Sequence, residues 1–289
     1  MSPIAPLDPD RVAAIVQVAL DEDAAQRDLT SSFLGLGDRT AVAEIAVAAP
    51  VTVCGIDVAL DVFRHVDAIC TLEALQGDGD QLPAGAAICR VEGRAASIVA
   101  AERTALNFLQ RMSGVATLAS RYVAAVDGTG VVILDTRKTI PLWRELDKYA
   151  VRCGGAQNHR RALDTMVLIK DNHIHALGGP QALIEHLAGA SGDQFIEVEV
   201  DSMEFLKALT ASRVDRIMLD NFTIVQVAEA LEYMREFHSE NEGRRIEIEV
   251  SGGITLENVR DYAQPGVDFI SVGAITHSAP AAPMSLSVL

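Results

Sequence analysis

Charged side chains follow two apolar runs near the middle of this sequence and are its strongest candidates for chemistry. VVILDTRKT, residues 131–139, carries Asp135, Arg137 and Lys138 near its end, and MVLIK, residues 166–170, ends in Lys170. Lysine and arginine bind carboxylates and phosphates through charge-assisted hydrogen bonds, which arginine can form in parallel pairs. This pattern predicts a site for a small ligand with several negative charges.

Later apolar runs add carboxylates to this set. FIEVEV, residues 195–200, contains Glu197 and Glu199, and RIMLD, residues 216–220, ends in Asp220. Such carboxylates can hold Mg²⁺ or sugar hydroxyls, or stabilise a developing cation. Because side chains alternate along a strand, Glu197 and Glu199 share one face, and one of them could simply be a salt-bridge partner inside the site.

Glycine turns follow the last two apolar runs. SGGI provides Ser251, Gly252 and Gly253, and SVGAI provides Gly273. Glycines let backbone N–H groups approach a phosphate, and barrels often bind phosphate after their late strands. A tight turn that needs positive φ is an equally good interpretation of each loop by itself.

The elements that must position these residues alternate beyond residue 115. Six apolar runs, beginning at residues 131, 166, 195, 216, 246 and 267, are separated by loops and helical stretches. This alternation predicts right-handed crossovers and a parallel sheet. The carboxyl ends of such strands share one face, where ligands bind, so we expect the polar residues to meet there.

The N-terminal part has a different pattern. Asp8 and Pro9 predict the start of a helix, and short apolar runs from about residue 41 to 92 predict a small antiparallel sheet. AASIVAAERTALNFLQRMSG then predicts a helix that stops at Gly114. We place a domain boundary at this glycine.

Charge and composition exclude several classes of partner. The formal net charge of −16 argues against nucleic acid or an acidic membrane, because polyanions bind basic patches. Residues 135–173 nevertheless hold eight cations against five anions, which favours a small anionic ligand. No apolar run reaches the roughly 18 residues of a membrane helix, and no signal-peptide pattern begins the chain, so we expect a cytoplasmic protein. The four cysteines lie far apart and are interpreted as free thiols.

Other chemistries find less support. Lys138 or Lys170 could form a Schiff base in an aldolase, but an electrostatic clamp explains the neighbouring arginines better. His173 and His175 form an HxH pair with no third metal ligand at useful spacing. No GxGxxG, GxxxxGK or serine-hydrolase motif supports dinucleotide binding, P-loop hydrolysis or serine catalysis.

DTRKT, KYAVRCGGAQNHR and LIKDNHI together resemble the signature of the quinolinate phosphoribosyltransferase family, the carboxylating nicotinate-nucleotide pyrophosphorylases. The resemblance extends upstream to ALDEDAAQRDLTS, DGDQLPAG and ERTALNFLQRMSG, and downstream to EVEV, MLDN, EVSGGI and SVGAITHS. It covers nearly the whole chain. The resemblance implies an α/β fold, an incomplete (open) TIM-like α/β barrel with an N-terminal mixed α/β sandwich domain.

The family's organisation and reaction become expectations for this chain. We expect the N-terminal domain over residues 1–114, joined by the C-terminal tail 275–289, and the catalytic barrel over residues 115–274. The resemblance implies a homodimer with shared active sites. It also implies that quinolinate and phosphoribosyl pyrophosphate give nicotinate mononucleotide, pyrophosphate and CO2, with Mg²⁺, in NAD biosynthesis. The alternatives are a paralogous protein of the same fold with another substrate, or a silent binding scaffold.

The family's site residues carry over by motif. Lys138, Lys170, Glu199 and Asp220 are expected to be catalytic, with Glu199 and Asp220 holding Mg²⁺ directly or indirectly. The residues expected to bind substrate are Arg103, supplied by the second subunit, and Arg137, His159, Arg160, Ser251, Gly252, Gly253 and Gly273. One departure follows DTRKT, where the family commonly has T-P-G-L-R and this chain has IPLWR, so that Leu142 replaces a glycine.

Overall fold

Asp8 and Pro9 begin the first helix, as predicted. Helix α1 (Pro9–Glu22) has Asp8 at its N-cap, and the Asp8 side chain accepts a hydrogen bond from the backbone of Asp10 at 3.0 Å. Proline suits the first helical position, because an N–H at that position would have no partner within the helix. The computed structural model describes residues 4–189, 192–241 and 243–289.

The described chain forms two compact units that do not follow chain order. The first contains the residues up to Ser120 together with Thr139–Gly155 and Ile275–Leu289. The second contains Arg121–Lys138 and Ala156–Ala274. Each unit therefore has its own core and is built from separate stretches of sequence.

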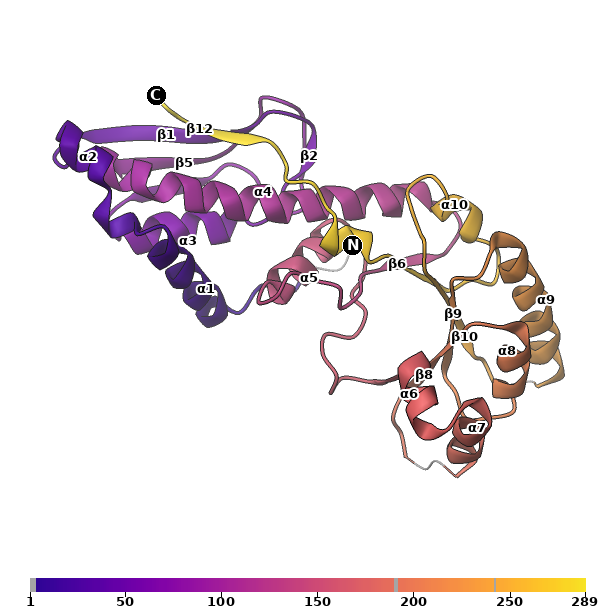
Figure 1. Ribbon diagram of the computed structural model, residues 1–289. Coiled ribbons are helices and arrows are strands. Elements are labelled where there is room, and N and C mark those ends of the chain that lie inside the picture. Colours follow the sequence, from indigo (N-terminus) through magenta and orange to yellow (C-terminus); the bar gives the residue numbers. More distant parts are fainter. Residues whose placement is uncertain (1–3, 190–191, 242) are drawn as a thin grey trace. The chain divides into compact units, whose positions relative to one another are not determined.

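A four-stranded antiparallel sheet forms one layer of the first unit, in the order β12–β1–β5–β3. Its strands are β1 (Thr40–Val47), β3 (Thr71–Ala74), β5 (Ala87–Arg94) and β12 (Met284–Val288). Helices α1, α3 (Ile56–Val66) and α4 (Ala95–Ala125) lie on one side of it (Figure 1). The unit also contains η1 (Ala25–Arg27), α2 (Leu29–Leu34), the short pair β2 (Val51–Thr52) and β4 (Gln81–Leu82), α5 (Arg144–Cys153) and most of α11 (Ala274–His277). The predicted antiparallel sheet is confirmed, whereas α3 was not predicted.

Gly114 does not end a helix. Helix α4 continues from Ala95 to Ala125, so the predicted stop is wrong. A Cβ atom at Gly114 would lie 2.1 Å from the carbonyl oxygen of Pro280. This glycine therefore allows the C-terminal segment to approach the helix closely. In a sequence, a glycine needed for close packing looks the same as a glycine that ends a helix.

Residues 139–155 lie in the first unit, although we expected them in the barrel domain, residues 115–274. Side-chain contacts within the first unit hold α5 there. Arg111 Nη2 donates to Asp147 Oδ1 at 3.1 Å, and the Tyr149 hydroxyl donates to Asp78 Oδ2 at 2.9 Å. Contacts between residues far apart in the sequence, rather than chain order, decide where this segment belongs.

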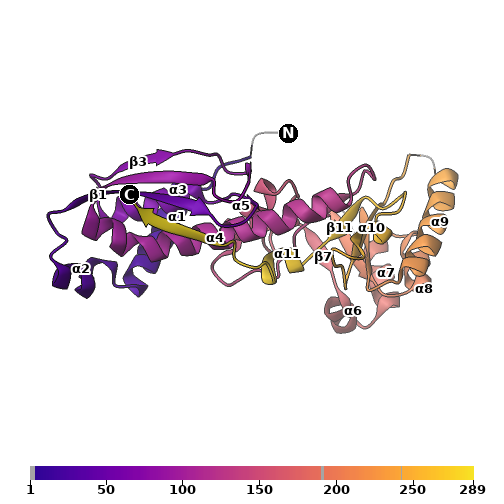
Figure 2. The same cartoon turned by 90° about the horizontal axis from the view of Figure 1, so that it is seen from above.

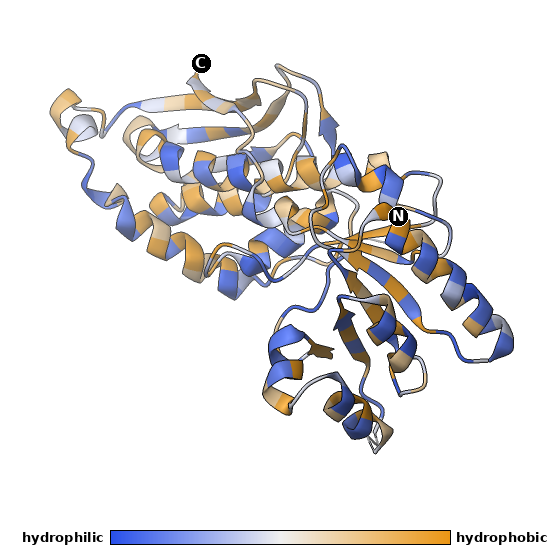
Figure 3. Ribbon diagram, turned by 45° about the vertical axis from the view of Figure 1, so that its right-hand side comes forward, coloured by the Kyte–Doolittle hydropathy of each residue, from blue (hydrophilic) through white to orange (hydrophobic). Residues whose placement is uncertain are grey.

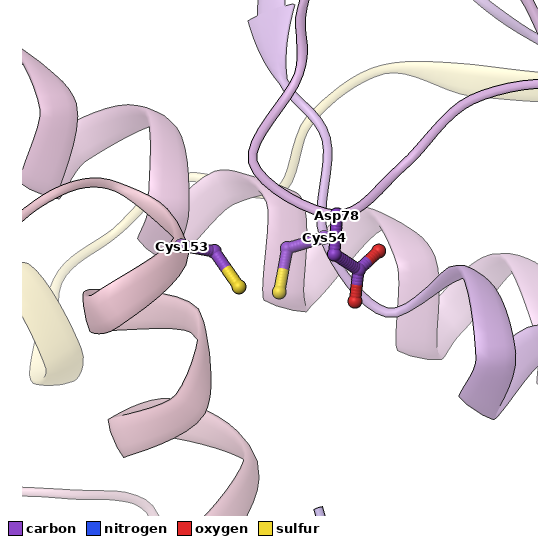
Figure 4. A group of neighbouring side chains, drawn as sticks. All are labelled: Cys54, Asp78 and Cys153. Carbon is purple, nitrogen blue, oxygen red and sulfur yellow. The ribbon is translucent and has the colours of Figure 1, made fainter. Parts of the chain in front are cut away.

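Cys54, Asp78 and Cys153 lie together at the start of α3 (Figure 4), where both cysteines are buried and Asp78 is half-buried. Asp78 accepts hydrogen bonds from the backbone N–H groups of Gly55 and Ile56 at 2.9–3.0 Å. The thiols of Cys54 and Cys153 lie side by side next to it, and the ligand atoms of the three side chains are within 4.8 Å of one another. Burial raises the pKa of the Cys54 thiol well above its ordinary range. Since the carboxylate is already hydrogen-bonded, we interpret this group as a helix cap with packed thiols, and all four cysteines are free, as predicted.

Six parallel strands form the sheet of the second unit, in the order β6–β11–β10–β9–β8–β7. They are β6 (Val132–Leu134), β7 (Val167–Ile169), β8 (Ile196–Val200), β9 (Arg216–Asp220), β10 (Glu247–Ser251) and β11 (Phe269–Ser271), which match the six predicted runs. The first strand pairs with the last, as in a barrel, while β6 and β7 form the two edges. The predicted open α/β barrel is confirmed.

Helices follow the strands of the barrel. They are α6 (Asp171–Leu177), α7 (Pro180–Ala188), α8 (Met203–Leu209), α9 (Ile224–Glu240) and α10 (Val259–Tyr262). Helices α8 and α9 pack side by side (Figures 1 and 2). Much of the strand surface is apolar (Figure 3), as expected for parallel strands covered by helices. Within the described residues, no helix combines the length and apolar character needed to cross a membrane.

Candidate active site

Four of the predicted catalytic residues meet at the carboxyl ends of neighbouring strands. Lys170 follows β7, Glu199 lies near the end of β8, and Asp220 ends β9. Lys170 Nζ lies 2.5 Å from Glu199 Oε2, which makes a charge-assisted pair across two strands. Lys138, beyond β6, is exposed at the same end of the sheet.

The titration of Asp220 reflects these neighbours. Burial raises the pKa of this carboxyl, and the negative charge of Glu199 raises it further. The charges of Lys170 and Lys138 act in the opposite direction. Lys138, Lys170 and Glu199 are therefore all within electrostatic reach of Asp220, although the four residues come from four different strand ends. Glu199 and Asp220 also line a hollow of about 290 Å³ beside α6 and α8.

A second pair of cations lies close by in the same unit. Burial lowers the pKa of Arg160, and the positive charge of Arg137 lowers it further, while Glu197 opposes this effect. The Arg160 side chain donates from Nη1 to the carbonyl oxygen of Met166 at 3.3 Å. Two arginines that repel each other in a partly buried place create a strong preference for an anion.

Asp135, at the end of β6, anchors the loop that carries His159 and Arg160. It is fully buried and accepts hydrogen bonds from the backbone N–H of His159 and from Asn158 Nδ2, both at 2.8 Å. A buried carboxylate is costly unless it is hydrogen-bonded, and these bonds supply that compensation. Asp135 thus has a structural role, whereas the cations beside it, Arg137 and Lys138, are placed to bind a ligand.

The strands separate the two glutamates that the sequence left equivalent. The Glu199 side chain is 14% exposed at the end of the barrel, whereas Glu197, two residues earlier, is completely buried. Glu197 lies instead beside His159, with 3.2 Å between His159 Nε2 and Glu197 Oε2. Glu199 is therefore the carboxylate placed for a ligand, and Glu197 belongs to the interior.

A buried charged network inside the barrel was missed in the sequence. Arg216 Nη1, from β9, lies 3.1 Å from Glu249 Oε2, from β10, and Ser271 Oγ, from β11, donates to Glu249 Oε1 at 2.5 Å. Burial raises the pKa values of Glu197 and Glu249 to about 7. The signal was the charged residue at every second position of FIEVEV and IEIEV, because alternate residues face the same side of a strand.

The glycine loops adopt the conformations that glycine permits. Gly252 and Gly253 have φ of 93° and 62°, and a Cβ atom at Gly252 would lie 2.3 Å from Asn221 Oδ1. The tight-turn interpretation is therefore satisfied, and it is compatible with a role in binding phosphate. Ser251 ends β10 and Gly273 lies just beyond β11, at the carboxyl ends of neighbouring strands.

Arg103 belongs to a different unit from the other predicted residues. It is an exposed residue of α4 in the first unit, whereas the other eleven belong to the second unit.

The donor set at the strand ends suits Mg²⁺ that is carried by a phosphate. Among the described residues, the two groups of three potential metal ligands are Cys54–Asp78–Cys153 and His159–Glu197–Glu249, and neither contains Glu199 or Asp220. Magnesium is usually bound by one or two carboxylates together with substrate phosphates and water. Two carboxylates beside cations fit that arrangement, and the HxH pair at residues 173–175 is in neither group.

Comparisons with known proteins agree along nearly the whole chain. The family model described as Quinolinate phosphoribosyl transferase, N-terminal domain, matches residues 28–113, and its C-terminal domain counterpart matches residues 115–287. The probable nicotinate-nucleotide pyrophosphorylase (carboxylating) of Methanocaldococcus jannaschii is 38% identical over 282 residues, which cover 97% of this chain and 98% of the relative. The corresponding Mycobacterium leprae protein is 42% identical over 231 residues, which cover 79% of this chain and 80% of the relative.

A solved structure has the same fold throughout. The nicotinate-nucleotide pyrophosphorylase from Francisella tularensis superposes with a TM-score of 0.90 at 36% identity, covering 100% of both chains. With both family models matched in order and relatives aligned over almost their full length, this chain belongs to the quinolinate phosphoribosyltransferase family.

Proposed function

We propose that this chain transfers the phosphoribosyl group of phosphoribosyl pyrophosphate to quinolinate and decarboxylates the product, forming nicotinate mononucleotide, pyrophosphate and CO2 in NAD biosynthesis. The observation that carries the proposal is the Lys170–Glu199 pair, which lies beside Asp220 and Lys138 at the strand ends. This site combines cations for phosphate with carboxylates for a ribose cation. The names of the relatives support the same reaction.

Quinolinate would be held by the arginines. It carries two carboxylates, and Arg137 and Arg160 are close enough for the charge of one to lower the pKa of the other. A dianion between them relieves this repulsion, and planar guanidinium groups can bind carboxylates through two hydrogen bonds. A neutral or singly charged ring compound would gain less from the same pair.

Phosphoribosyl transfer would take place next to Glu199 and Asp220. As the bond to pyrophosphate breaks, the ribose gains positive charge, which fixed carboxylates stabilise without reorganisation. Lys138 and Lys170 would offset the charge of the departing pyrophosphate. Mg²⁺ bound to Glu199 and Asp220, directly or through water, would neutralise phosphate charge. Backbone N–H groups after Ser251 and around Gly273 would seat the 5′-phosphate.

Decarboxylation would follow from ribosylation itself. Once the ring nitrogen carries the ribose, its positive charge stabilises the electron pair that the departing CO2 leaves on the neighbouring carbon. This carbon then takes up a proton from water, and the site residues would hold the ring in place during both steps. An ion pair between Lys170 and Glu199 suits this electrostatic role better than the Schiff-base alternative, which needs a neutral amine.

We further propose a cytoplasmic homodimer in which Arg103 of one subunit completes the site of the other. Arg103 is exposed on α4, which allows it to reach another chain. Mixing an Arg103→Ala variant with a Lys170→Ala variant tests this arrangement, because subunit exchange would create one intact site in the mixed dimer. Partial recovery of activity is expected, and none after verified exchange would refute shared sites.

Release of labelled CO2 from carboxyl-labelled quinolinate tests the reaction. Release should require phosphoribosyl pyrophosphate and Mg²⁺ together, and omitting either should abolish it. Lys170→Met should lower kcat/KM by roughly 10²–10³-fold, the usual effect of removing one electrostatic group from a site. Lys207→Met is the matched control, since Lys207 packs against the Tyr233 ring on the helical side of the same unit. Folded wild-type protein that releases no CO2 under these conditions would refute the proposed function.

A further inference from the structure

We propose that His159 is a positioning residue: its ring links Arg160 to Glu197 and Glu249 in the barrel interior and does not itself hold a substrate carboxylate. The inference rests on the proposed function, because Arg160 is placed there as a ligand of quinolinate. It differs from the role that the family resemblance implied for His159, and it adds Glu197 and Glu249 to the residues that the reaction needs.

Both nitrogens of the His159 ring already have partners. The Arg160 backbone N–H donates to His159 Nδ1 at 2.7 Å. A nitrogen that accepts a hydrogen bond carries no proton, so the proton of the neutral ring must be on Nε2. Nε2 donates to Glu197 Oε1 at 3.5 Å, and it also lies 3.2 Å from Glu197 Oε2 and 3.7 Å from Glu249 Oε2, so both carboxylates surround this side of the ring. With 6% of the side chain exposed, the ring offers a ligand little surface.

The partners of the ring are fixed by the sheet. Glu249 is held from both sides, by Ser271 Oγ at 2.5 Å and by Arg216 Nη1 at 3.1 Å. Arg216 is held in turn by Glu247 at 2.7 Å and lies over the Phe269 ring, with 3.9 Å from Cζ to the ring centroid. Three neighbouring strands thus determine where the carboxylates beside the His159 ring lie. A side chain whose neighbours are locked in this way holds one orientation.

The consequence falls on Arg160. The backbone N–H of Arg160 is tied to the ring, and the backbone N–H of His159 is tied to Asp135 Oδ1 at 2.8 Å. The start of the Arg160 side chain is therefore placed by two buried groups, and its guanidinium is braced by Met166. Bidentate binding of a carboxylate depends on the plane of the guanidinium, so a small loss of order here weakens quinolinate binding.

Two substitutions at Glu197 test whether this residue acts as a hydrogen-bond acceptor for His159 or only fills space in the barrel interior. Glu197→Gln keeps an acceptor oxygen for Nε2–H, whereas Glu197→Leu has a similar volume and no acceptor. We expect Glu197→Leu to raise the KM for quinolinate about tenfold, the upper range for one hydrogen bond, and Glu197→Gln to stay within about threefold of wild type. The KM for phosphoribosyl pyrophosphate should change less than about twofold in both variants, because His159 positions Arg160 alone. Equal effects of the two variants on the two substrates would overturn the proposal.

A measurement on the wild-type protein keeps the test independent of how these variants fold. Nitrogen-15 resonances of labelled histidine rings report which nitrogen carries the proton, and the His159 signals are assigned by their loss in His159→Asn. We expect an unprotonated Nδ1 and a protonated Nε2 near neutral pH, unchanged when quinolinate saturates the protein. A proton on Nδ1, or a doubly protonated ring formed on adding quinolinate, would show direct ligand contact and overturn the proposal. If wild-type protein neither binds quinolinate nor releases CO2, the proposed function fails while the ring measurement still decides the role of His159.

Discussion

Replacing Arg216 with methionine would remove the cation that compensates two buried glutamates. Arg216 contacts Glu249 at 3.1 Å and lies 4.0 Å from Glu197, and both carboxylates are completely buried. Methionine keeps most of the apolar stem that lies against Phe269. The substitution therefore removes charge while disturbing packing little.

The expected loss is large and depends on pH. Removing one partner of a buried ion pair destabilises a protein by about 3–5 kcal/mol, because the other charge is left uncompensated. Burial is the main reason that Glu197 and Glu249 titrate at about 7 instead of 4.5, and Arg216 is among the charges that lower both pKa values. Without Arg216 both carboxyls should titrate at still higher pH.

The direction of the pH effect follows from the raised pKa values. Between pH 4.5 and 7 the folded protein keeps protons that the unfolded chain has released, so the stability from these two groups is complete below about 4.5 and is lost as pH rises. Arg216 offsets this loss only when the carboxyls are charged. We therefore expect Arg216→Met to cost about 3–5 kcal/mol at pH 8 and about 1 kcal/mol or less at pH 5.5, where the carboxyls are neutral.

Urea unfolding at the two pH values, followed by circular dichroism, measures the difference. Hydrogen exchange of peptides from β8, β9 and β10 would locate the loss in the barrel, which is useful because a chain of two units need not unfold in one step. Arg235→Met is the matched control, since Arg235 is 76% exposed on α9, and it should change stability by less than about 0.5 kcal/mol. An equal loss at pH 5.5 and pH 8, or a loss below about 1 kcal/mol at pH 8, would refute the reasoning.

Three further predictions concern the backbone and are read from thermal unfolding and hydrogen exchange. Gly114→Ala should destabilise the first unit by about 1–3 kcal/mol, because the added Cβ would lie 2.1 Å from a carbonyl oxygen. Gly37→Ala is the control and should be nearly neutral, because Gly37 has open space around it. Equal losses of stability in the two variants would contradict the close approach at Gly114. Leu142→Gly should stabilise the protein by about 0.5–1 kcal/mol. Leu142 has φ of 67° and is 92% exposed, so glycine relieves backbone strain and little packing is lost. A loss of stability would argue against strain at this residue. Thr223→Ala should cost about 1 kcal/mol by removing the capping box of α9, seen as faster exchange in its first turn, while Thr223→Ser should keep it.

The loop after DTRKT, in which this chain differs from the family pattern, keeps a backbone conformation that favours glycine. Leu142 occupies the position at which the family resemblance implies glycine, and its backbone has the positive φ that glycine adopts without strain. The conformation therefore persists although the residue has changed. Trp143 beside it stacks on Phe108, with ring centroids 5.1 Å apart, which helps to hold the loop in place.

The sequence by itself determined the family, the six strands of the open barrel and the set of residues at their ends. This was possible because strands, helix caps and family motifs depend on residues that are close together in the sequence, such as LIKDNHI and the alternation in FIEVEV. The positions of the cations at the strand ends could be predicted for the same reason, since they follow their strands closely in the sequence. The alternation also placed Glu197 and Glu199 on one face, but it says nothing about depth along the strand.

Tertiary structure alone decided which residues act together. It placed Glu199 beside Lys170 and Glu197 beside His159, assigned residues 139–155 to the first unit, and turned Gly114 from a predicted helix stop into a point of close packing. Each of these outcomes depends on contacts between segments far apart in the chain. No local periodicity encodes such contacts, because the free energy of burying a charge or a backbone is set by the neighbours that folding brings to it.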